Sequence, residues 1–129
     1  MNEIAEAAAW VALAEEDYAL ARSALRRRTP LIYGATFHAQ QCAEKYLKAI
    51  LVQWGQAFPR THDLIALCDL CAHQGIAIPV EQDAIQRLVA YAVQVRYPGE
   101  APILEEARSA LETARAIRYF ARKLLGLAR

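Results

Sequence analysis

The chain has 129 residues and a formal net charge of +1, from 15 Lys and Arg against 14 Asp and Glu. This length suits one folding unit with its own core, so we expect residues 1–129 to form a single domain. With 56% hydrophobic residues and only 5 Gly and 5 Pro, the composition excludes disorder and low-complexity repeats. The balanced charge gives no strong signal for nucleic-acid binding and none for a polybasic membrane module.

Alanine, the best helix former, makes up roughly a fifth of the chain, which favours an all-α fold. A first helix is predicted from about Glu3 to Arg27. Its apolar stripe recurs at alternating steps of three and four residues, at Ile4, Ala7, Val11, Ala14, Tyr18, Ala21 and Leu25. The run Arg26-Arg27-Arg28 is typical of a basic helix end, with an anion site as the alternative.

The second helix is predicted to begin at Thr29-Pro30, because threonine can cap a helix and proline suits its first position. It is expected to end at Gly55, which can adopt the left-handed conformation that closes a helix. Its buried stripe is Ala39, Ala43, Tyr46, Ile50 and Trp54. Thr61 is then expected to cap a short third helix that ends near Gly75.

A fourth helical segment is predicted to open at Ile78-Pro79 and to close at Pro98-Gly99, with Ile85 and Leu88 on its apolar side. Pro102 is expected to begin the last helix. Short connections force successive helices to be roughly antiparallel. The sequence therefore predicts an up-and-down bundle of four to five helices.

The chain has an odd number of cysteines, namely Cys42, Cys68 and Cys71. Its N-terminal segment lacks the features of a secretory signal, so we expect a cytoplasmic protein. No apolar run approaches the roughly 20 residues needed to span a bilayer, and no membrane association is expected. The Cys68-x-x-Cys71 pair resembles half of a zinc site but lies within an apolar helical run. We interpret the cysteines as small buried apolar residues and expect neither a metal nor a cofactor.

Four polar residues of the second helix, His38, Gln41, Lys45 and Lys48, follow one another at steps of three and four. This spacing places them in one row, which we expect to lie opposite the core stripe. The row is either a set of donors for phosphate or a partner's carboxylates, or an ordinary solvated helix face on which Glu44 and Lys48 pair.

Two further segments carry polar side chains at helix ends. Thr61-His62-Asp63 places an imidazole at a helix N-terminus, where the helix dipole favours the neutral ring and hydrogen bonding over charge pairing. The same three residues can equally be a plain capping cluster. Arg96-Tyr97-Pro98 ends the fourth segment with a guanidinium and a phenol on a turn fixed by proline.

The stretch FHAQQCAEKYLKAILVQWG, followed by THDL and then by VRYP, resembles the HEPN domains of bacteria and archaea in order and spacing. This resemblance implies a helical bundle that usually dimerises, is commonly encoded beside a minimal nucleotidyltransferase, and in some members is proposed to bind nucleotides. By position, the recurring polar residues of that family fall on Gln41, Glu44, Lys45, Lys48, His62, Asp63, Arg96, Tyr97 and Pro98.

Many HEPN proteins are metal-independent ribonucleases, an activity that depends on an arginine followed by four to six residues and a histidine. After Arg96 the three allowed positions hold Ala101, Pro102 and Ile103, so the motif is absent. Loss of a general acid/base removes about 10²–10⁴-fold in rate, and we therefore expect no catalytic residue. A histidine–arginine pairing of His62 with Arg96 in space is the remaining route to an atypical ribonuclease.

We therefore expect a non-catalytic homodimeric module, which pairs with a minimal nucleotidyltransferase in a toxin–antitoxin-like or substrate-binding role. Its ligand would be a nucleotide such as ATP or GTP. Lys45, Lys48, His62 and Arg96 are the candidates for phosphate contacts, and His38, Gln41, Glu44, Asp63 and Tyr97 for supporting polar contacts. The alternatives are the atypical ribonuclease and a purely structural dimer scaffold. Large rings at Trp10, Tyr46, Trp54, Phe58 and Tyr97 suggest a shared apolar patch between two copies.

Overall fold

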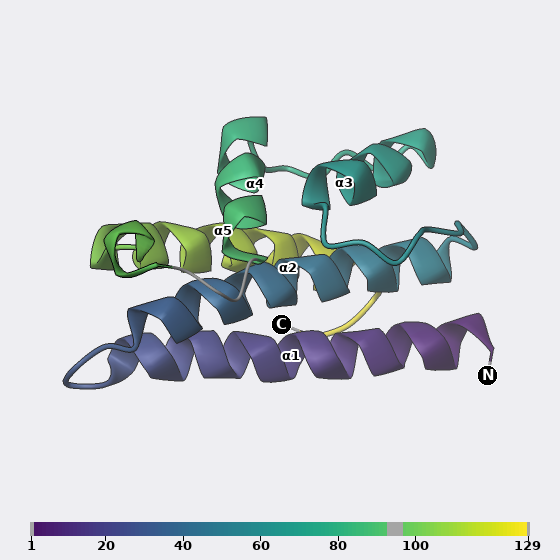
Figure 1. The fold of residues 1–129 in the computed structure, drawn as a ribbon. Coiled ribbons are helices and arrows are strands. Elements are labelled where there is room, and N and C mark those ends of the chain that lie inside the picture. Colours follow the sequence, from purple (N-terminus) through teal and green to yellow (C-terminus); the bar gives the residue numbers. More distant parts are fainter. Residues whose placement is uncertain (1, 93–96, 129) are drawn as a thin grey trace.

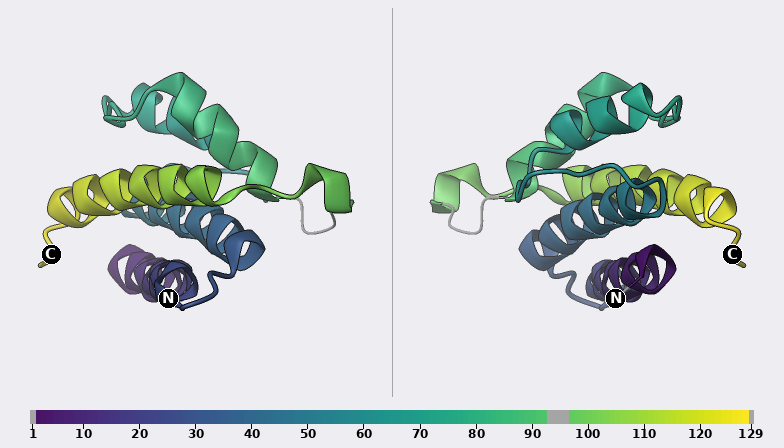
Figure 2. Two further views of the ribbon diagram at one scale, coloured as in Figure 1. Left: turned by 90° about the vertical axis from the view of Figure 1, so that its left-hand side faces the viewer. Right: turned by 90° about the vertical axis from the view of Figure 1, so that its right-hand side faces the viewer.

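The computed structural model describes residues 2–92 and 97–128, and the helices among them confirm the predicted all-α bundle. Three long helices dominate: α1 (Glu3–Arg26), α2 (Ile32–Gln53) and α5 (Leu104–Leu124). Two short helices, α3 (Leu64–His73) and α4 (Gln82–Val89), lie on the side of α2 and α5 that faces away from α1 (Figures 1 and 2). Helix α2 thus occupies the middle of the molecule.

The connection between α1 and α2 is longer than predicted. Helix α1 ends at Arg26, and α2 begins only at Ile32 after an N-cap at Leu31 that offers no side-chain hydrogen bond. The prediction that Thr29 caps α2 is therefore wrong. The bend is closed instead by the backbone, because the Leu31 amide donates to the Ala24 carbonyl at 3.0 Å. At the other end, Gly55 follows α2 with φ of 69°, as predicted.

The cap of helix α3 lies two residues after the expected one. Asp63 is its N-cap, and the Asp63 carboxylate accepts from the amides of Ile65 at 3.0 Å and Ala66 at 3.3 Å. Thr61 supports this turn by accepting from the Asp63 amide at 3.0 Å. A carboxylate suits the positive end of a helix better than a neutral hydroxyl, which explains the shift. The predicted end near Gly75 is confirmed, with φ of 78° there.

The fourth helical segment is shorter than predicted. Regular α-helix covers only Gln82–Val89 and continues as one 3₁₀ turn, η1 (Ala90–Ala92); a second 3₁₀ turn, η2, spans Pro98–Glu100. Residues 93–96 lie outside the described residues, so the predicted continuation to Pro98 is not described there. Helix α5 starts two residues after Pro102, with the Glu106 side chain accepting from the Ile103 amide at 3.0 Å.

The core is built around α2, of which 14 of 22 residues are buried. The predicted stripe is confirmed at Ala39, Ala43, Tyr46 and Ile50, each fully buried, but Trp54 lies 36% exposed at the helix end. On α1, the stripe is buried from Ala7 to Ala21, whereas Ile4 is 75% exposed. Both errors fall in terminal turns, where no neighbouring helix remains to cover the side chain.

Within the described residues, none of the helices is long and apolar enough to cross a membrane.

Candidate functional site

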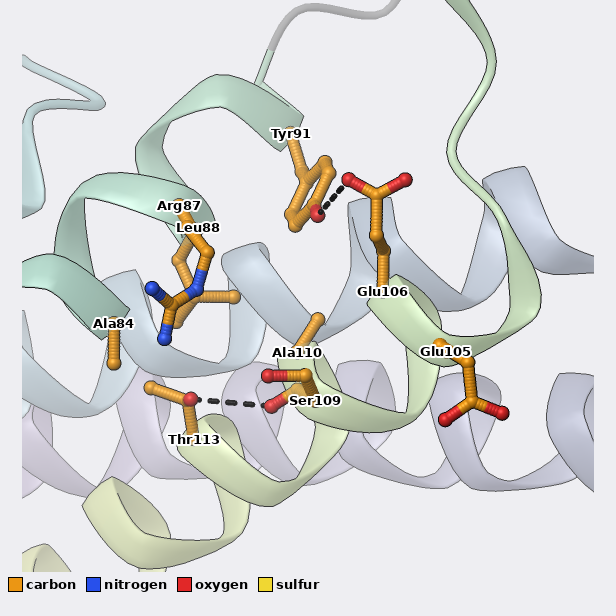
Figure 3. A pocket seen from close by; sticks show the side chains of 9 residues that line it. All are labelled: Ala84, Arg87, Leu88, Tyr91, Glu105, Glu106, Ser109, Ala110 and Thr113. Atoms are coloured by element: carbon orange, nitrogen blue, oxygen red, sulfur yellow. Dashed lines mark hydrogen bonds between the residues drawn. The ribbon is translucent and has the colours of Figure 1, made fainter.

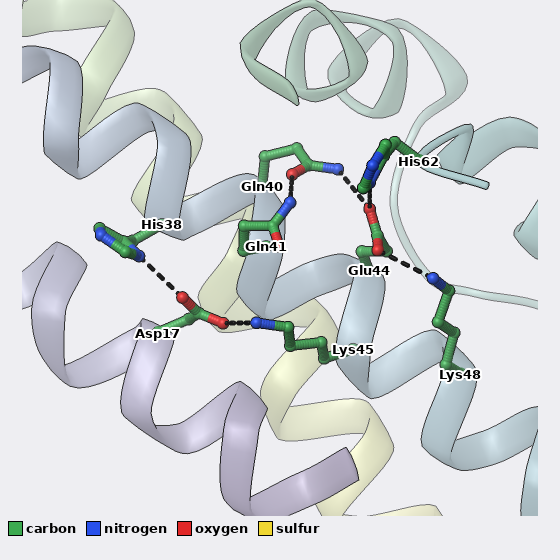
Figure 4. Close-up of polar contacts among 8 residues, drawn as sticks. All are labelled: Asp17, His38, Gln40, Gln41, Glu44, Lys45, Lys48 and His62. Atoms are coloured by element: carbon green, nitrogen blue, oxygen red, sulfur yellow. Dashed lines mark hydrogen bonds and ion pairs between the residues drawn. The ribbon is translucent and has the colours of Figure 1, made fainter. Parts of the chain in front are cut away.

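The Glu44 cluster joins α2 to the loop before α3. The Glu44 carboxylate accepts hydrogen bonds from Gln40 Nε2 at 3.1 Å, Lys48 Nζ at 2.9 Å and His62 Nδ1 at 2.8 Å (Figure 4). Gln41 completes the cluster by donating from Nε2 to the Gln40 side-chain oxygen at 2.6 Å. The three donors to Glu44 fix the positions of one lysine and one histidine relative to each other.

Burial and hydrogen bonding act in opposite directions on Glu44. Its removal from water raises the pKa of the Glu44 carboxyl, but the hydrogen bonds from Lys48, Gln40 and His62 outweigh this and hold the pKa below its ordinary value of 4.5. Glu44 is therefore ionised at neutral pH. An ionised carboxylate only accepts hydrogen bonds, so Nδ1 of His62 carries a proton. The other ring nitrogen, Nε2, does not take part in the contact with Glu44.

Lys48 is buried, with 6% of its surface exposed, and contacts two aromatic rings in addition to Glu44. Its Nζ lies 5.3 Å from the centre of the Trp10 ring and 6.0 Å from that of Phe58. Trp10 and Phe58 themselves meet edge to face, with ring centres 6.4 Å apart. The ammonium is thus held by one carboxylate and by the faces of two rings.

The Asp17 cluster lies beside the Glu44 cluster on the same polar row of α2, between α1 and α2. Asp17 is 5% exposed and accepts from His38 Nδ1 at 2.7 Å and from Lys45 Nζ at 2.6 Å (Figure 4). The two clusters therefore repeat one pattern, in which a buried carboxylate holds a lysine and a histidine. They do not share a side chain.

The prediction that the polar row of α2 forms a ridge or a solvated face is wrong. Lys48 is buried, and Glu44 beside it is 3% exposed; His38, Gln41 and Lys45 are half-buried. The reason is the central position of α2, because α1 covers one side of the row and the loop before α3 covers the other (Figure 1). The expected pairing of Glu44 with Lys48 is confirmed.

Lys48 and His62 line a pocket of about 600 Å³ at the end of the bundle that holds the start of α1. Its walls come from α1, α2 and the loop before α3, and they comprise Glu6, Trp10, Lys48, Phe58, Arg60, Thr61 and His62. Arg60 is exposed and has no carboxylate partner among the described residues. The pocket thus combines an aromatic pair with three cationic or ionisable nitrogen groups and one carboxylate, that of Glu6.

The remaining site candidates lie elsewhere. Lys45 does not line the pocket of Lys48 and His62, because it is bound to Asp17. Asp63 is occupied as the cap of α3. Tyr97 is 74% exposed at the start of η2, and Arg96 lies outside the described residues. The nine predicted residues are therefore not gathered at one place, and only Lys48 and His62 of the four phosphate candidates are seen to meet.

His62 does not have the environment that its helix-end position suggested. Its ring hydrogen bonds to a carboxylate, Glu44, rather than to neutral groups, and it remains largely exposed, with 69% of its side chain accessible. The prediction of hydrogen bonding in place of charge pairing therefore missed the Glu44 partner. Asp63, next in sequence, satisfies the helix N-terminus, which leaves the imidazole free to reach Glu44.

Sequence reasoning missed Asp17, Gln40 and a third polar network around Glu15. Glu15 accepts from Arg118 Nε at 2.7 Å and Nη2 at 2.9 Å and also from the Tyr46 hydroxyl, so it joins α1, α2 and α5. The hydrogen bonds from Arg118 hold the pKa of Glu15 below 4.5, although partial burial acts in the opposite direction. A signal for Asp17 was present, because it follows Ala14 by three and precedes Ala21 by four, on the buried face.

A smaller pocket of about 210 Å³ lies between α4, η1 and α5 (Figure 3). The Tyr91 hydroxyl donates there to Glu106 at 3.3 Å, and Glu105 and Arg87 also line the walls. Two carboxylates against one guanidinium make this pocket unfavourable for a phosphate group.

The cysteines behave as expected for apolar residues, since Cys42 and Cys71 are fully buried and Cys68 is half-buried. Burial raises the pKa of the Cys71 thiol to about 11 and that of Cys68 to about 12. Within residues 2–92 and 97–128, no group of three or more His, Cys, Asp and Glu is placed to hold a metal ion.

Comparison with known proteins gives one family and one solved structure. The model of the HEPN domain matches residues 7–124. The crystal structure of TT1696 from Thermus thermophilus is similar over 95% of this chain and 98% of that chain, with a TM-score of 0.70 and 28% sequence identity. No curated protein matches the chain.

Proposed function

The chain belongs to the HEPN family, and on this basis we propose that it is a non-catalytic helical module that binds a nucleotide in the pocket of Trp10, Phe58 and Lys48. The role we assign is substrate binding or a toxin–antitoxin-like function beside a minimal nucleotidyltransferase.

The observation that carries this proposal is the combination of an aromatic pair with nitrogen groups in one pocket. A nucleotide offers a flat apolar base and a charged phosphate chain, and proteins bind the two parts by ring contacts and by cationic donors. Trp10 and Phe58 supply the rings, while Arg60 and His62 lie on the adjoining loop. The volume of about 600 Å³ is within the range of small-molecule sites.

Charge within the pocket assigns different roles to its cations. Lys48 is already paired with Glu44 at 2.9 Å, so the pair brings almost no net charge to a phosphate. Arg60 has no such partner in the described part of the chain, and its guanidinium can bind two phosphate oxygens at once. Arg60, which the sequence did not single out, is therefore the main phosphate contact in this proposal, and Lys48 positions the rings.

The nucleotide part is tested by calorimetric titration of the full chain with ATP and with GTP. We expect saturable heat for at least one nucleotide and a loss of affinity of about tenfold in Arg60→Ala, the value of one charge-assisted contact. Arg28→Ala is the matched control, because it removes the same exposed charge outside the pocket. Absence of heat with both nucleotides overturns the proposal, as does an equal loss in both variants.

We also assign a homodimeric state, which the exposed apolar face of the N-terminal half of α1 supports. Ala5, Ala9, Ala12 and Leu13 are all exposed there, and small side chains let two helices approach closely. Tyr46 does not contribute to such a patch, because it is fully buried. Light scattering should give twice the mass of one chain for the unmodified protein. The Leu13→Arg variant should have the mass of a single chain. A single-chain mass for the unmodified protein contradicts the assignment.

The assigned protein partner is a minimal nucleotidyltransferase, and the assigned compartment is the cytoplasm. The support for the partner is family membership, and three free thiols fit a reducing compartment. Co-elution of the purified chain with a nucleotidyltransferase encoded beside it tests the pairing. Separate elution at micromolar concentrations contradicts it.

A second candidate function, a metal-independent ribonuclease, is favoured by the geometry of His62. Its Nδ1 donates to the ionised Glu44, which leaves Nε2 available as a proton acceptor on an exposed ring. This candidate requires RNA cleavage that is lost in His62→Ala and in Arg96→Ala. Intact RNA after incubation with the unmodified protein removes it.

A further inference from the structure

A third pocket, which we name the Arg27 pocket, lies where the end of α1 meets the start of α2. It has a volume of about 310 Å³ and is lined by residues that include Leu20, Ser23, Arg27, Leu31, Gly34 and His38. It shares no residue with the nucleotide pocket of Trp10 and Phe58. Its described lining residues contain one guanidinium, one imidazole and one hydroxyl group but no carboxylate.

His38 is held in this pocket by a buried carboxylate. Asp17, 5% exposed, accepts from His38 Nδ1 at 2.7 Å, so Nδ1 carries a proton. The other ring nitrogen, Nε2, lies on the side away from Asp17 (Figure 4). A histidine oriented in this way can donate from Nε2 to an anion when it is protonated, or accept from a protonated phosphate oxygen.

The charges around the Arg27 pocket leave it cationic. Asp17 also binds Lys45 at 2.6 Å, and the lysine balances its charge. Within residues 2–92 and 97–128, Arg27 has no carboxylate partner, so its charge is not balanced in the same way. The start of α2 adds to this, because no side chain caps it and Leu31 and Gly34 line the pocket, so the positive end of the helix dipole lies beside it.

Of the three consecutive arginines at the end of α1, only Arg27 lines the pocket. Arg26 and Arg28 are also exposed but lie outside it. Successive helical side chains point about 100° apart, so Arg27 is the member of the run that lies in the same pocket as His38.

We propose that the Arg27 pocket binds a phosphate group, with Arg27 and His38 as its direct contacts and Ser23 as a third donor. The guanidinium binds two phosphate oxygens, and the imidazole binds a third from the opposite wall. Asp17 is a positioning residue that acts through His38. This site is independent of the proposed function, because its residues and its ligand contacts are separate from those of the nucleotide pocket.

The test follows the ring signals of His38 by NMR while the full chain is titrated with inorganic phosphate and, separately, with a dinucleotide joined by one phosphodiester. Saturable shifts with phosphate alone assign the site to a terminal phosphate, and shifts with the dinucleotide assign it to a phosphodiester. Absence of a shift at His38 with both probes overturns the proposal.

Three neighbouring variants provide the specificity control. Arg27→Ala should weaken binding of the probe that shifts the His38 signals, phosphate or dinucleotide, by about tenfold. Arg26→Ala and Arg28→Ala should change its affinity by less than about twofold. All three arginines are exposed, so none of the variants is expected to impair folding. Equal effects of the three variants would reveal only a diffuse basic surface and would overturn the site. Arg60→Ala leaves binding at His38 unchanged, which separates this result from the test of the nucleotide pocket.

Discussion

Replacing Glu44 with alanine removes the carboxylate that Gln40, Lys48 and His62 share. The Lys48 ammonium is then left without a counterion at a position where only 8% of its side chain is exposed. Removal of one partner from a buried ion pair costs about 3–5 kcal/mol. The rings of Trp10 and Phe58 remain within 6.0 Å of the ammonium and continue to stabilise it, so we expect the lower end, about 3 kcal/mol.

The assay is urea unfolding of the full chain, followed by circular dichroism. Glu105→Ala is the matched control, because Glu105 pairs with Arg108 at 3.3 Å on the surface and should contribute less than about 1 kcal/mol. The double variant Glu44→Ala/Lys48→Met should be more stable than Glu44→Ala alone, since the unpaired charge is gone and methionine packs against the same rings. A loss below about 1 kcal/mol in Glu44→Ala, or no recovery in the double variant, would refute this reasoning.

Three further outcomes are expected. First, because the pKa of Glu44 in the folded protein lies below 4.5, its contribution to stability is present above that value and is lost as the pH falls through the folded pKa. The unfolding free energies at about pH 6 and about pH 3 should therefore differ less in Glu44→Gln than in the unmodified protein. Equal differences in the two proteins would contradict this. Second, the thiol pKa is about 11 for Cys71 and about 12 for Cys68, against an ordinary 9.0, so fewer of these thiols are in the reactive thiolate form. Labelling of the native protein by a disulfide reagent should therefore be at least about 100-fold slower than labelling of the urea-unfolded chain. Comparable rates would count against burial of the cysteines. Third, Gly55→Ala should destabilise the protein by about 1 kcal/mol, because φ is 69° there. Gly34→Ala should stabilise it by a similar amount, because Gly34 lies within a helix and has open space around it. Thermal unfolding that shows the same sign of change for both variants would refute the backbone argument.

The helices could be predicted from the sequence because their stripes and glycine ends are local signals. The buried positions of α2 and the closing residue Gly55 follow directly from spacing. The starts of helices were less predictable, because two caps compete within a few residues. Thr61 and Asp63 both qualify by type, and only the geometry of the turn decides that Asp63 accepts from the helix amides.

The candidate site was only partly predictable, because the partner of a polar side chain depends on which helices meet. The spacing of Glu44 and Lys48 correctly indicated a pair. It could not show that both are buried, since that depends on α1 and the loop before α3. Likewise, Arg60 carries no motif, and it becomes a candidate only when the fold places it beside Trp10 and Phe58.

The nucleotide pocket is tested most directly by the fluorescence of Trp10. The chain has two tryptophans, so Trp54→Phe leaves Trp10 as the single indole reporter. Titration of this variant with ATP and with GTP should change Trp10 emission saturably for at least one nucleotide, and the added substitution Arg60→Ala should shift the curve to higher concentration. Emission that stays constant with both nucleotides, or a curve that Arg60→Ala leaves in place, would contradict nucleotide binding in this pocket.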